Sequence, residues 1–196
     1  MSALVIVESP VKASLVARYA RPILGKDTVT RACFGHLRDL PEGELGVDVD
    51  RGFLPRYVIQ TKRDGLIGEL RTLICAASTI YLATDPDREG EAVAWHVCQV
   101  FKPDLKGKQV WRVSFHEITE RAVQQALKNP RRLDIRLVQA AVARRVMDRL
   151  VGYIVSPVLW KHVRGKELSA GRVQTAALRI LAEAEKRTVT TVEIEL

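Results

Sequence analysis

The stretch "TIYLATDPDREGEAVAWH", residues 79–96, runs from an apolar segment into four closely spaced carboxylates. Its first six residues are apolar, aromatic or β-branched, a pattern typical of a buried strand, and a helix is predicted from about Glu89 to Phe101. Asp85 and Asp87 lie between the two elements. Carboxylates this close repel one another unless solvent or a cation separates them. The stretch therefore predicts a strand, a loop with a chemical role, and a helix.

Strands alternate with helices through the first two thirds of the chain. Strands are predicted at 3–8, 29–34, 79–84 and 110–115, and helices at 11–20, 64–77, 89–101 and 120–127. Residues 41–61, which are rich in Gly and Pro, favour an extended excursion over a regular element. Alternation of this kind predicts an α/β fold with a mostly parallel sheet flanked by helices.

The character of the sequence changes after Asn129-Pro130. The elements predicted beyond it are helices at 134–151 and from Ser169 to about Lys186, and a strand at 188–196. We therefore expect an α/β domain at residues 1–130, followed by an α-helical segment at residues 131–196.

Composition excludes several classes of protein. With 47% hydrophobic residues in 196, the chain can bury an ordinary core. Its apolar runs are far shorter than the roughly 20 residues that span a bilayer, and its first residues lack a signal-peptide pattern. We expect a cytoplasmic protein that does not enter a membrane.

The three cysteines, Cys33, Cys75 and Cys98, stand far apart in the sequence. An odd number without a C-x-x-C pair argues against a disulfide framework and against a zinc ribbon. We expect buried thiols.

The net charge of +8 is concentrated in the last third of the chain. Residues 1–127 hold 17 Lys and Arg against 16 Asp and Glu, whereas residues 128–196 hold 14 against 7. A basic segment beside an acidic cluster suits nucleic acid, because cationic side chains displace counterions from phosphates. A basic solvated surface without a partner is the alternative.

The acidic cluster is expected at a sheet edge that binds ligands. Open parallel sheets bind them at the carboxyl ends of the strands, where Asp85 and Asp87 should lie, with Glu89 in the first helical turn. Their oxygens suit Mg²⁺, which needs only one or two protein carboxylates beside a phosphate. Alternatively, the acids favour the positive end of the helix dipole. That accounts for Glu89 and Glu91 but poorly for an Asp-x-Asp before the helix.

Glu8 occupies the equivalent place at the end of the first predicted strand. A neighbouring strand brings it near the cluster, where other acids and partial desolvation raise a carboxyl pKa and suit the group to general acid or base work. Lys12, one turn into the next helix, neutralises this acidic edge or contacts phosphate. For Glu8 the alternative is a solvated charge or a helix cap, and for Lys12 it is a solvated charge.

Arginines form a stripe on the first helix after the boundary. Arg145 and Arg149 share a face, and Tyr153 joins them if the helix continues. Asp148 is spaced to pair with Arg144 or Arg145, which would orient a guanidinium. Such a stripe supplies phosphate contacts and a stacking surface for an unpaired base. A salt-bridged helix surface is the alternative.

The run "SAGRVQ", residues 169–174, predicts a helix start. Ser169 is the expected cap, Gly171 allows close backbone approach, and the first amides of the helix can receive phosphate. A helix cap without a ligand is the alternative.

Histidines by themselves favour structural roles. His36 in "GHLRD" is expected to be a hydrogen-bonded loop residue. Trp95 and Phe115 beside His96 and His116 predict packed surroundings for these two rings.

Seven blocks of sequence resemble those of bacterial type IA DNA topoisomerases, in order and approximate spacing. They are "VIVESPVKA" at 5–13, "GHLRDLP" at 35–41, "LGVDVDRGFLPRYV" at 45–58, "YLATDPDREGEAVAWH" at 81–96, "RVSFHEIT" at 112–119, "ARRVMDRLVGYIVSPVLWK" at 143–161 and "LSAGRVQTAALR" at 168–179. The resemblance covers residues 4 to about 185, and it is specific because seven ordered blocks carry it.

The resemblance implies that the first domain is a Toprim domain, an α/β module shared by topoisomerases, bacterial primases and some nucleases. Glu8, Asp85, Asp87 and Glu89 match the family's acidic magnesium centre. Lys12 matches a lysine that stabilises charge on the scissile phosphate.

The resemblance also implies that the basic helices line a groove for DNA. The residues that match the groove are His36, Arg144, Arg145, Asp148, Arg149, Tyr153, Lys161, Ser169, Ala170, Gly171, Arg172, Val173 and Gln174. The expected partner is single-stranded or negatively supercoiled DNA, and the expected cofactor is Mg²⁺.

Type IA enzymes cut one strand by attack of a tyrosine in a block resembling "TYxRTDS". None of the four tyrosines, Tyr19, Tyr57, Tyr81 and Tyr153, stands in such a block. We therefore expect an amino-terminal part of such an enzyme, with half of an active site, inactive without the rest of a topoisomerase chain. The alternatives are a stand-alone Toprim nuclease that uses metal-activated water and an inert single-strand binder.

Overall fold

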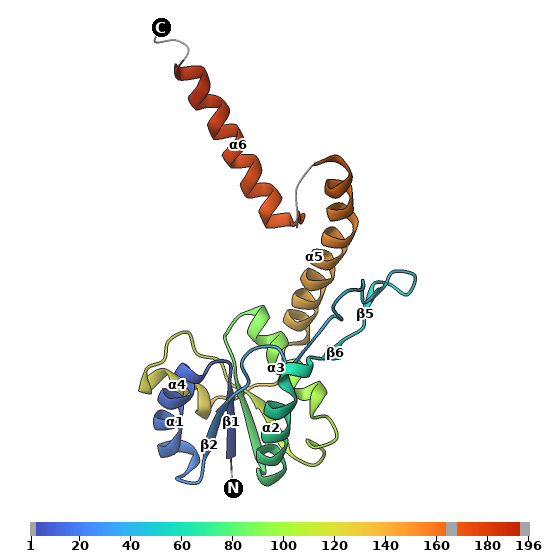
Figure 1. Cartoon of the computed structure of the whole chain (residues 1–196). Coiled ribbons are helices and arrows are strands. Elements are labelled where there is room, and N and C mark those ends of the chain that lie inside the picture. The colour runs from blue at the N-terminus through green and yellow to red at the C-terminus, as the bar shows by residue number, and fades with distance from the viewer. Residues whose placement is uncertain (1–2, 164–167, 193–196) are drawn as a thin grey trace. The chain divides into compact units, whose positions relative to one another are not determined.

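The structure, a computed structural model, describes residues 3–163 and 168–192, with side chains through residue 186. The chain, drawn in Figure 1, divides into two compact units, residues 1–142 and 143–196. The first unit holds the sheet, and the second is helical.

Four parallel strands form the main sheet in the order β2-β1-β7-β8. The strands are β1 (Ala3–Val7), β2 (Val29–Ala32), β7 (Thr79–Ala83) and β8 (Gln109–Arg112). The helices of this unit are α1 (Pro10–Leu24), α2 (Asp64–Ala76), α3 (Arg88–Val100) and α4 (Glu120–Lys128). The predicted α/β fold with a parallel sheet is confirmed. Helices carry the chain from one parallel strand to the next, because such strands need long crossovers.

Side chains of the central strands alternate between two buried cores. Leu4 and Ile6 of β1 face α2 and α3, whereas Val5 and Val7 face α1 and α4. Figure 1 shows the two pairs of helices on opposite sides of the sheet. Because both faces are covered, the central strands are continuous apolar runs in the sequence.

Residues 41–61 form an excursion from the main sheet, as predicted, but contrary to the prediction they include three two-residue strands in antiparallel ribbons. β3 (Arg38–Asp39) pairs with β6 (Val58–Ile59), and β4 (Val47–Asp48) pairs with β5 (Leu54–Pro55). A 3-10 turn at Thr61–Arg63 then leads into α2. Because β3 pairs with β6, Arg38 on β3 and Tyr57 just before β6 lie on neighbouring segments.

The second unit contains most of α5 (Ile135–His162) and all of α6 (Arg172–Val192). Trp160 Nε1 donates to the carbonyl of Leu168 at 2.6 Å, and the N–H of Ala170 donates to Ser156 Oγ at 2.9 Å. These bonds hold the approach to α6 against α5. No helix within residues 3–163 and 168–192 is both long and apolar enough to cross a bilayer.

Two predictions for the helical segment are wrong. Residues 188–192 belong to α6 instead of a strand, and residues 193–196 lie outside the described part. A strand needs a neighbour for its backbone groups, whereas a helix satisfies them internally. Ser169 is not the cap, because α6 begins at Arg172 and the N–H of Thr175 donates to the carbonyl of Gly171.

Burial corrects two further expectations. Cys33 is buried as predicted, but Cys75 is exposed because it lies on the outer face of the amphipathic helix α2. His96 is packed, at 3% exposure. His116 is exposed, since it lies in the connection after β8 and not in an element that faces a core.

Gly90 packs against the loop that carries the acids, and this contact predicts a stability change. A Cβ at Gly90 would lie 2.2 Å from the carbonyl oxygen of Asp85 and 2.7 Å from its nitrogen. Since both are backbone atoms, the loop itself would have to shift. We predict that Gly90→Ala lowers the free energy of unfolding by about 1–3 kcal/mol, measured by urea unfolding.

Gly68→Ala is the matched control. Gly68 lies in α2 with nothing within 4 Å of an added Cβ. Alanine there should raise the free energy of unfolding by up to about 1 kcal/mol, because alanine favours a helix. A Gly90→Ala protein as stable as the unmutated chain would contradict the packing described.

Candidate active site and nucleic-acid interface

The register of β1 and β7 brings Glu8 to the acidic loop. Val7 pairs with Ala83 in these parallel strands, so Glu8 and Thr84 follow side by side and Asp85 comes next. The electrostatic influence of both Asp85 and Asp87 on Glu8 reflects this proximity. The predicted meeting of Glu8 with the acidic loop at the carboxyl edge of the sheet is therefore confirmed.

Lys12 reaches the same edge from the first turn of α1. Ser9 caps this helix by accepting a hydrogen bond from the N–H of Lys12, and Pro10 occupies the first turn. The Lys12 ammonium forms an ion pair with Oδ1 of Asp85. Both side chains are partly exposed, at 30% and 40%, so solvent can still enter between them.

Asp87 and Glu89 have other immediate partners. Asp87 Oδ1 caps α3 by accepting from the N–H of Gly90 at 2.8 Å, and Glu89 lies 3.8 Å from Arg88 Nε with half of its side chain exposed. Thr84 Oγ1 donates to the carbonyl of Gly90 at 2.6 Å and closes the loop onto the helix. These contacts leave Asp87 Oδ2 outside the cap.

The oxygens of these acids are of the kind that bind Mg²⁺, but the side chains are not arranged as a preformed metal site. Within the described residues, no three His, Cys, Asp or Glu side chains converge as metal ligands. The Lys12 ammonium is the cation that Asp85 holds. Since Mg²⁺ needs only one or two protein carboxylates and completes its shell with water and phosphate, the oxygens of Asp85 and Asp87 fit this ion.

The pKa of Glu8 is raised above its ordinary value. Burial is the largest cause and the negative charge of Asp85 adds to it, while Lys12 acts in the opposite direction. Glu8 therefore retains a proton at higher pH than an exposed glutamate does.

A buried arginine holds the backbone of the acidic loop. Arg112, at the end of β8, is 1% exposed. Its guanidinium donates to the carbonyls of Leu82 and Thr84 at 2.9 Å each, and also to that of Asp85. These three carbonyls cover the end of β7 and the start of the loop, so Arg112 fixes the course of the chain where the acids begin.

Glu91 is the counter-ion of Arg112 and joins a third segment to this site. Its carboxylate, fully buried, accepts from Arg112 Nε at 2.9 Å, from Arg131 Nη2 at 2.7 Å and from the N–H of Asp134 at 2.7 Å. Burial alone would raise the pKa of Glu91, but these donors outweigh it and lower the pKa. Glu91 thus connects α3 to β8 and to the segment before α5.

Sequence reasoning did not find this network. Glu91 does lie in the first turn of α3, as the helix-dipole interpretation requires. Its buried ion pairs were not expected. An arginine inside the apolar run 110–115 was the available signal, because a buried charge needs a partner. Nothing in the sequence around Arg131 pointed to Glu91.

A second cluster surrounds Arg38. Its Nε donates to Nδ1 of His96 at 2.6 Å, and its guanidinium lies 4.9 Å from the ring centre of Tyr57 and 4.7 Å from that of Trp95. The His36 ring meets His96 edge-on at 5.1 Å. His36 therefore belongs to an aromatic cluster beside α3.

The arginine stripe of the second unit has the predicted helical spacing. Asp148 pairs with Arg144, one of its two predicted partners, with Oδ2 3.7 Å from Nε. Its Oδ1 also accepts a hydrogen bond from Arg172 Nε at 2.8 Å, which was not predicted. The Arg149 guanidinium lies 5.4 Å from the ring centre of Tyr153. These side chains are partly exposed or exposed, and so accessible to a ligand.

The other residues predicted to contact DNA lie at the end of α5 and around the start of α6. Lys161 is exposed in the last turn of α5. Ser169, Ala170 and Gly171 precede α6, and Arg172, Val173 and Gln174 form its first turn. A hollow of about 500 Å³ in this unit is lined by Arg144, Arg172, Val173, Ala176, Ala177 and Ile180.

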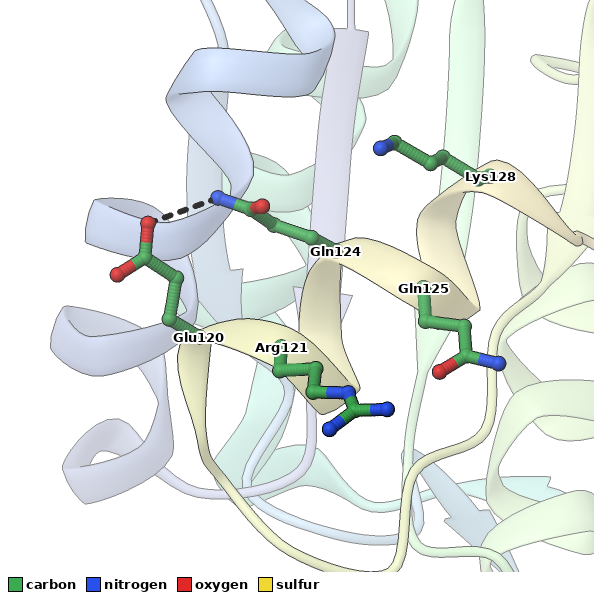
Figure 2. A pocket seen from close by; sticks show the side chains of 5 residues that line it. All are labelled: Glu120, Arg121, Gln124, Gln125 and Lys128. Carbon is green, nitrogen blue, oxygen red and sulfur yellow. Dashed lines mark hydrogen bonds between the residues drawn. The ribbon is translucent and has the colours of Figure 1, made fainter.

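A second hollow lies along α4 and is not lined by the acids of the candidate active site. Figure 2 shows its five lining side chains, Glu120, Arg121, Gln124, Gln125 and Lys128, all from this one helix. Gln124 Nε2 donates to Glu120 Oε1 at 3.0 Å. Neither Glu8 nor the acidic loop lines it, so the candidate active site stays at the carboxyl edge of β1 and β7.

Comparison with known proteins gives two family matches in order along the chain. The Toprim domain matches residues 3–118, and the family described as DNA topoisomerase matches residues 132–193. DNA topoisomerase 1 of Mycolicibacterium smegmatis is 47% identical over an alignment of 197 positions, and the alignment covers 93% of this chain and 20% of that protein. The structure of full-length topoisomerase I from Thermotoga maritima matches with a TM-score of 0.79 and 40% identity, over 93% of this chain and 30% of that one.

The buried network predicts a large stability effect for Glu91. Glu91→Ala would leave the guanidinium of Arg112 buried without its counter-ion. We predict a loss of about 3–5 kcal/mol in the free energy of unfolding, measured by urea unfolding. Glu89→Ala, two residues away and half exposed, is the control and should cost at most about 1 kcal/mol. Equal effects of the two variants would argue against the network.

His96 predicts a pH dependence of stability. Burial, with Arg38 and His36 adding to it, lowers the pKa of His96 from 6.5 to about 3. Between these two pH values the unfolded chain binds a proton at His96 and the folded chain does not. The free energy of unfolding therefore falls as the pH drops from about 6.5 toward 3, by at most about 1.4 kcal/mol per pH unit.

The difference in unfolding free energy between the unmutated chain and His96→Asn isolates this effect from the carboxylates. It should change with pH across the window from about 3 to 6.5. A His96 ring that titrates near 6.5 by NMR would contradict the prediction.

Proposed function

Because the chain belongs to the type IA DNA topoisomerases, with a Toprim domain followed by the start of their helical region, we propose that it binds magnesium and a single DNA strand for strand cleavage and rejoining. The chain spans about a fifth of the curated relative, and the proposed activity is that of a complete topoisomerase. In that enzyme, cleaving one strand and rejoining it relaxes negative supercoils.

One observation carries the proposal. Glu8, Lys12 and Asp85 come from two neighbouring parallel strands and the helix after one of them, and they meet at the carboxyl edge of the sheet. Ligands of open α/β sheets bind at this edge. An acid with a raised pKa, a lysine and a pair of aspartates can supply the proton transfer, the charge stabilisation and the metal ligands that phosphoryl transfer on DNA uses.

Asp85, Asp87 and Glu89, with Glu8 beside them, are the residues that would hold magnesium. When bound, Mg²⁺ supplies positive charge that orients phosphate oxygens and offsets their charge. The Asp87 oxygen outside the helix cap and the solvent-accessible side of Asp85 support this assignment.

Glu8 is the proposed general acid. When a nucleophile forms a bond to phosphorus and the bond to the 3′ oxygen breaks, that oxygen takes the Glu8 proton. In rejoining, the proton returns to Glu8. Its raised pKa suits the role, because a larger fraction of the carboxyl group carries a proton.

Lys12 is the proposed contact for the scissile phosphate. Its ion pair with Asp85 places the ammonium at the acidic edge, and its partial exposure lets a phosphate oxygen share it. Charge that develops on the phosphate would then be stabilised by a cation already in position.

The basic helices and His36 are the proposed contacts along the strand. Arg145, Arg149, Tyr153 and Lys161 would bind phosphates and stack an unpaired base, with Arg144, Asp148 and residues 169–174 completing the groove. The exposure of Lys161 and the Arg149–Tyr153 stacking support these roles.

The nucleophile is proposed to be a tyrosine from the remainder of a topoisomerase chain. We place the Toprim domain at residues 1–130 and the partial helical domain at residues 131–196. Family matches that end at 118 and begin at 132 support this boundary, whereas the two compact units of the structure divide after residue 142. Work on chromosomal DNA would place the chain in the cytoplasm.

Magnesium titration by calorimetry tests the site. We predict that the unmutated chain binds Mg²⁺ and that Asp85→Asn with Asp87→Asn abolishes the heat of binding. Asp104→Asn is the matched control, because Asp104 pairs with Arg71 of α2 and is not part of the acidic loop. No Mg²⁺ binding by the unmutated chain would refute the proposed site.

A plasmid assay separates the alternatives. With Mg²⁺, the chain alone should bind single-stranded DNA and leave a negatively supercoiled plasmid unrelaxed. Relaxation would refute the missing nucleophile, and Mg²⁺-dependent hydrolysis of single-stranded DNA would instead favour a nuclease. DNA binding unaffected by Asp85→Asn, without any Mg²⁺ binding, would favour an inert binder.

A further inference from the structure

Arg38, on β3, has a guanidinium that contacts two aromatic rings and one histidine. Tyr57 and Trp95 cover the guanidinium at 4.9 and 4.7 Å, and its Nε is anchored on Nδ1 of His96 at 2.6 Å. Tyr57 comes from the excursion, and Trp95 and His96 come from α3. A planar cation that stacks on aromatic rings and has one fixed hydrogen bond keeps little rotational freedom.

His96 can accept this hydrogen bond only as a neutral ring. Arg38 donates to Nδ1, so the remaining ring proton must lie on Nε2. His96 is 3% exposed, and its burial keeps the ring unprotonated at neutral pH. The hydrogen-bond acceptor for Arg38 is therefore present at neutral pH.

The outer edge of the guanidinium remains available. Within the described part of the chain, Nη1 and Nη2 of Arg38 have no hydrogen-bond or ion-pair partner, and neither is among the buried unsatisfied atoms. Arg71, which also lies near an aromatic ring, instead pairs with Asp104. Because Nε of Arg38 is already hydrogen-bonded and its two terminal nitrogens are not, this guanidinium can receive an anion at its outer edge.

The chain topology brings this guanidinium close to the acidic edge. Cys33, just after β2, donates its N–H to the carbonyl of Val7, so residues 33–38 leave the sheet beside Glu8. His96 lies seven residues after Glu89 on α3, about 10 Å along the helix. A strand that passes the acids would have its next phosphates within reach of this region.

We propose that Arg38 is a pre-organised contact for one backbone phosphate of the DNA strand, and that His96 is the positioning residue that aims its fork. This inference rests on the proposed function. Two N–H donors match two oxygens of one phosphate.

Anisotropy of a labelled single-stranded oligonucleotide, measured against KCl concentration, tests the proposal on the 196-residue chain. Arg38→Gln should weaken binding about tenfold at low salt, because one charge-assisted contact is lost. It should also reduce the slope of log K against log salt by about 0.7, the value for one phosphate on a single strand. Arg71→Gln removes the same charge elsewhere and should change neither quantity.

Two variants of His96 test its positioning role. His96→Leu removes the acceptor and should weaken binding severalfold while the charge of Arg38 stays. His96→Asn keeps an acceptor oxygen near the place of Nδ1 and should restore most of the affinity. A purely structural role would instead lower affinity in both variants in proportion to lost stability.

The outcomes separate this inference from the proposed function. If Arg145→Gln and Arg149→Gln weaken binding but folded Arg38→Gln keeps the affinity and slope of the unmutated chain, the Arg38 contact is refuted alone. No binding by the unmutated chain would overturn both. Should Arg38→Gln fail to fold, Arg38→Lys decides: affinity equal to that of the unmutated chain would refute a pre-organised fork.

An oligonucleotide with one neutral methylphosphonate, moved along the strand, identifies the anion. One position should weaken binding to the unmutated chain and have no further effect on Arg38→Gln. Loss of that specific coupling would refute a DNA phosphate as the ligand. A DNA phosphate would also be refuted as the ligand if inorganic phosphate displaced the labelled oligonucleotide as well as an unlabelled oligonucleotide did at the same phosphate concentration.

Discussion

The ion pair between Arg112 and Glu91 is the constraint on which the candidate site depends. Burying a guanidinium and a carboxylate is costly, and the cost is offset only where every donor and acceptor is satisfied. Here Arg112 meets three carbonyls at the end of β7 and the start of the acidic loop, and Glu91 meets three donor residues from β8 and from the segment before α5. The loop can therefore vary little in its course, which suits a site that must hold charges in position.

The electrostatics of the acidic edge follow from this arrangement. Arg112 and Arg131 together carry one positive charge more than Glu91 balances, and they lie behind the loop that holds Asp85. Lys12 adds a cation on the solvent side. These cations offset the charges of several acids at this edge, but the pKa of Glu8 is still raised, because burial and the charge of Asp85 favour its protonated form.

Much of the fold was predictable, and the reasons are particular. β1 and β7 are apolar on both faces, so their runs in the sequence are unmistakable, whereas β8 is short and its predicted range of 110–115 was too long. The length of α5 was underestimated, because the helix continues past the predicted end at residue 151 to His162, and Pro157 inside it does not terminate it. In the candidate site, Glu8 and the acids of the loop were predictable from their places after strands. The contacts of Arg38 with aromatic rings and with His96 were not predictable, because these residues lie far apart in the chain.

The amino-acid sequence by itself determined the α/β alternation, the identity of the acids and their places at strand ends, because periodicity and strand-to-loop boundaries are local properties. Only the tertiary structure decided which partner each charge has: Lys12 for Asp85, Arg112 and Arg131 for Glu91, and the two rings and His96 for Arg38. Such pairings depend on strand register and on how helices pack across the sheet. Those long-range contacts bring together residues whose spacing in the chain carries no sign of their contact.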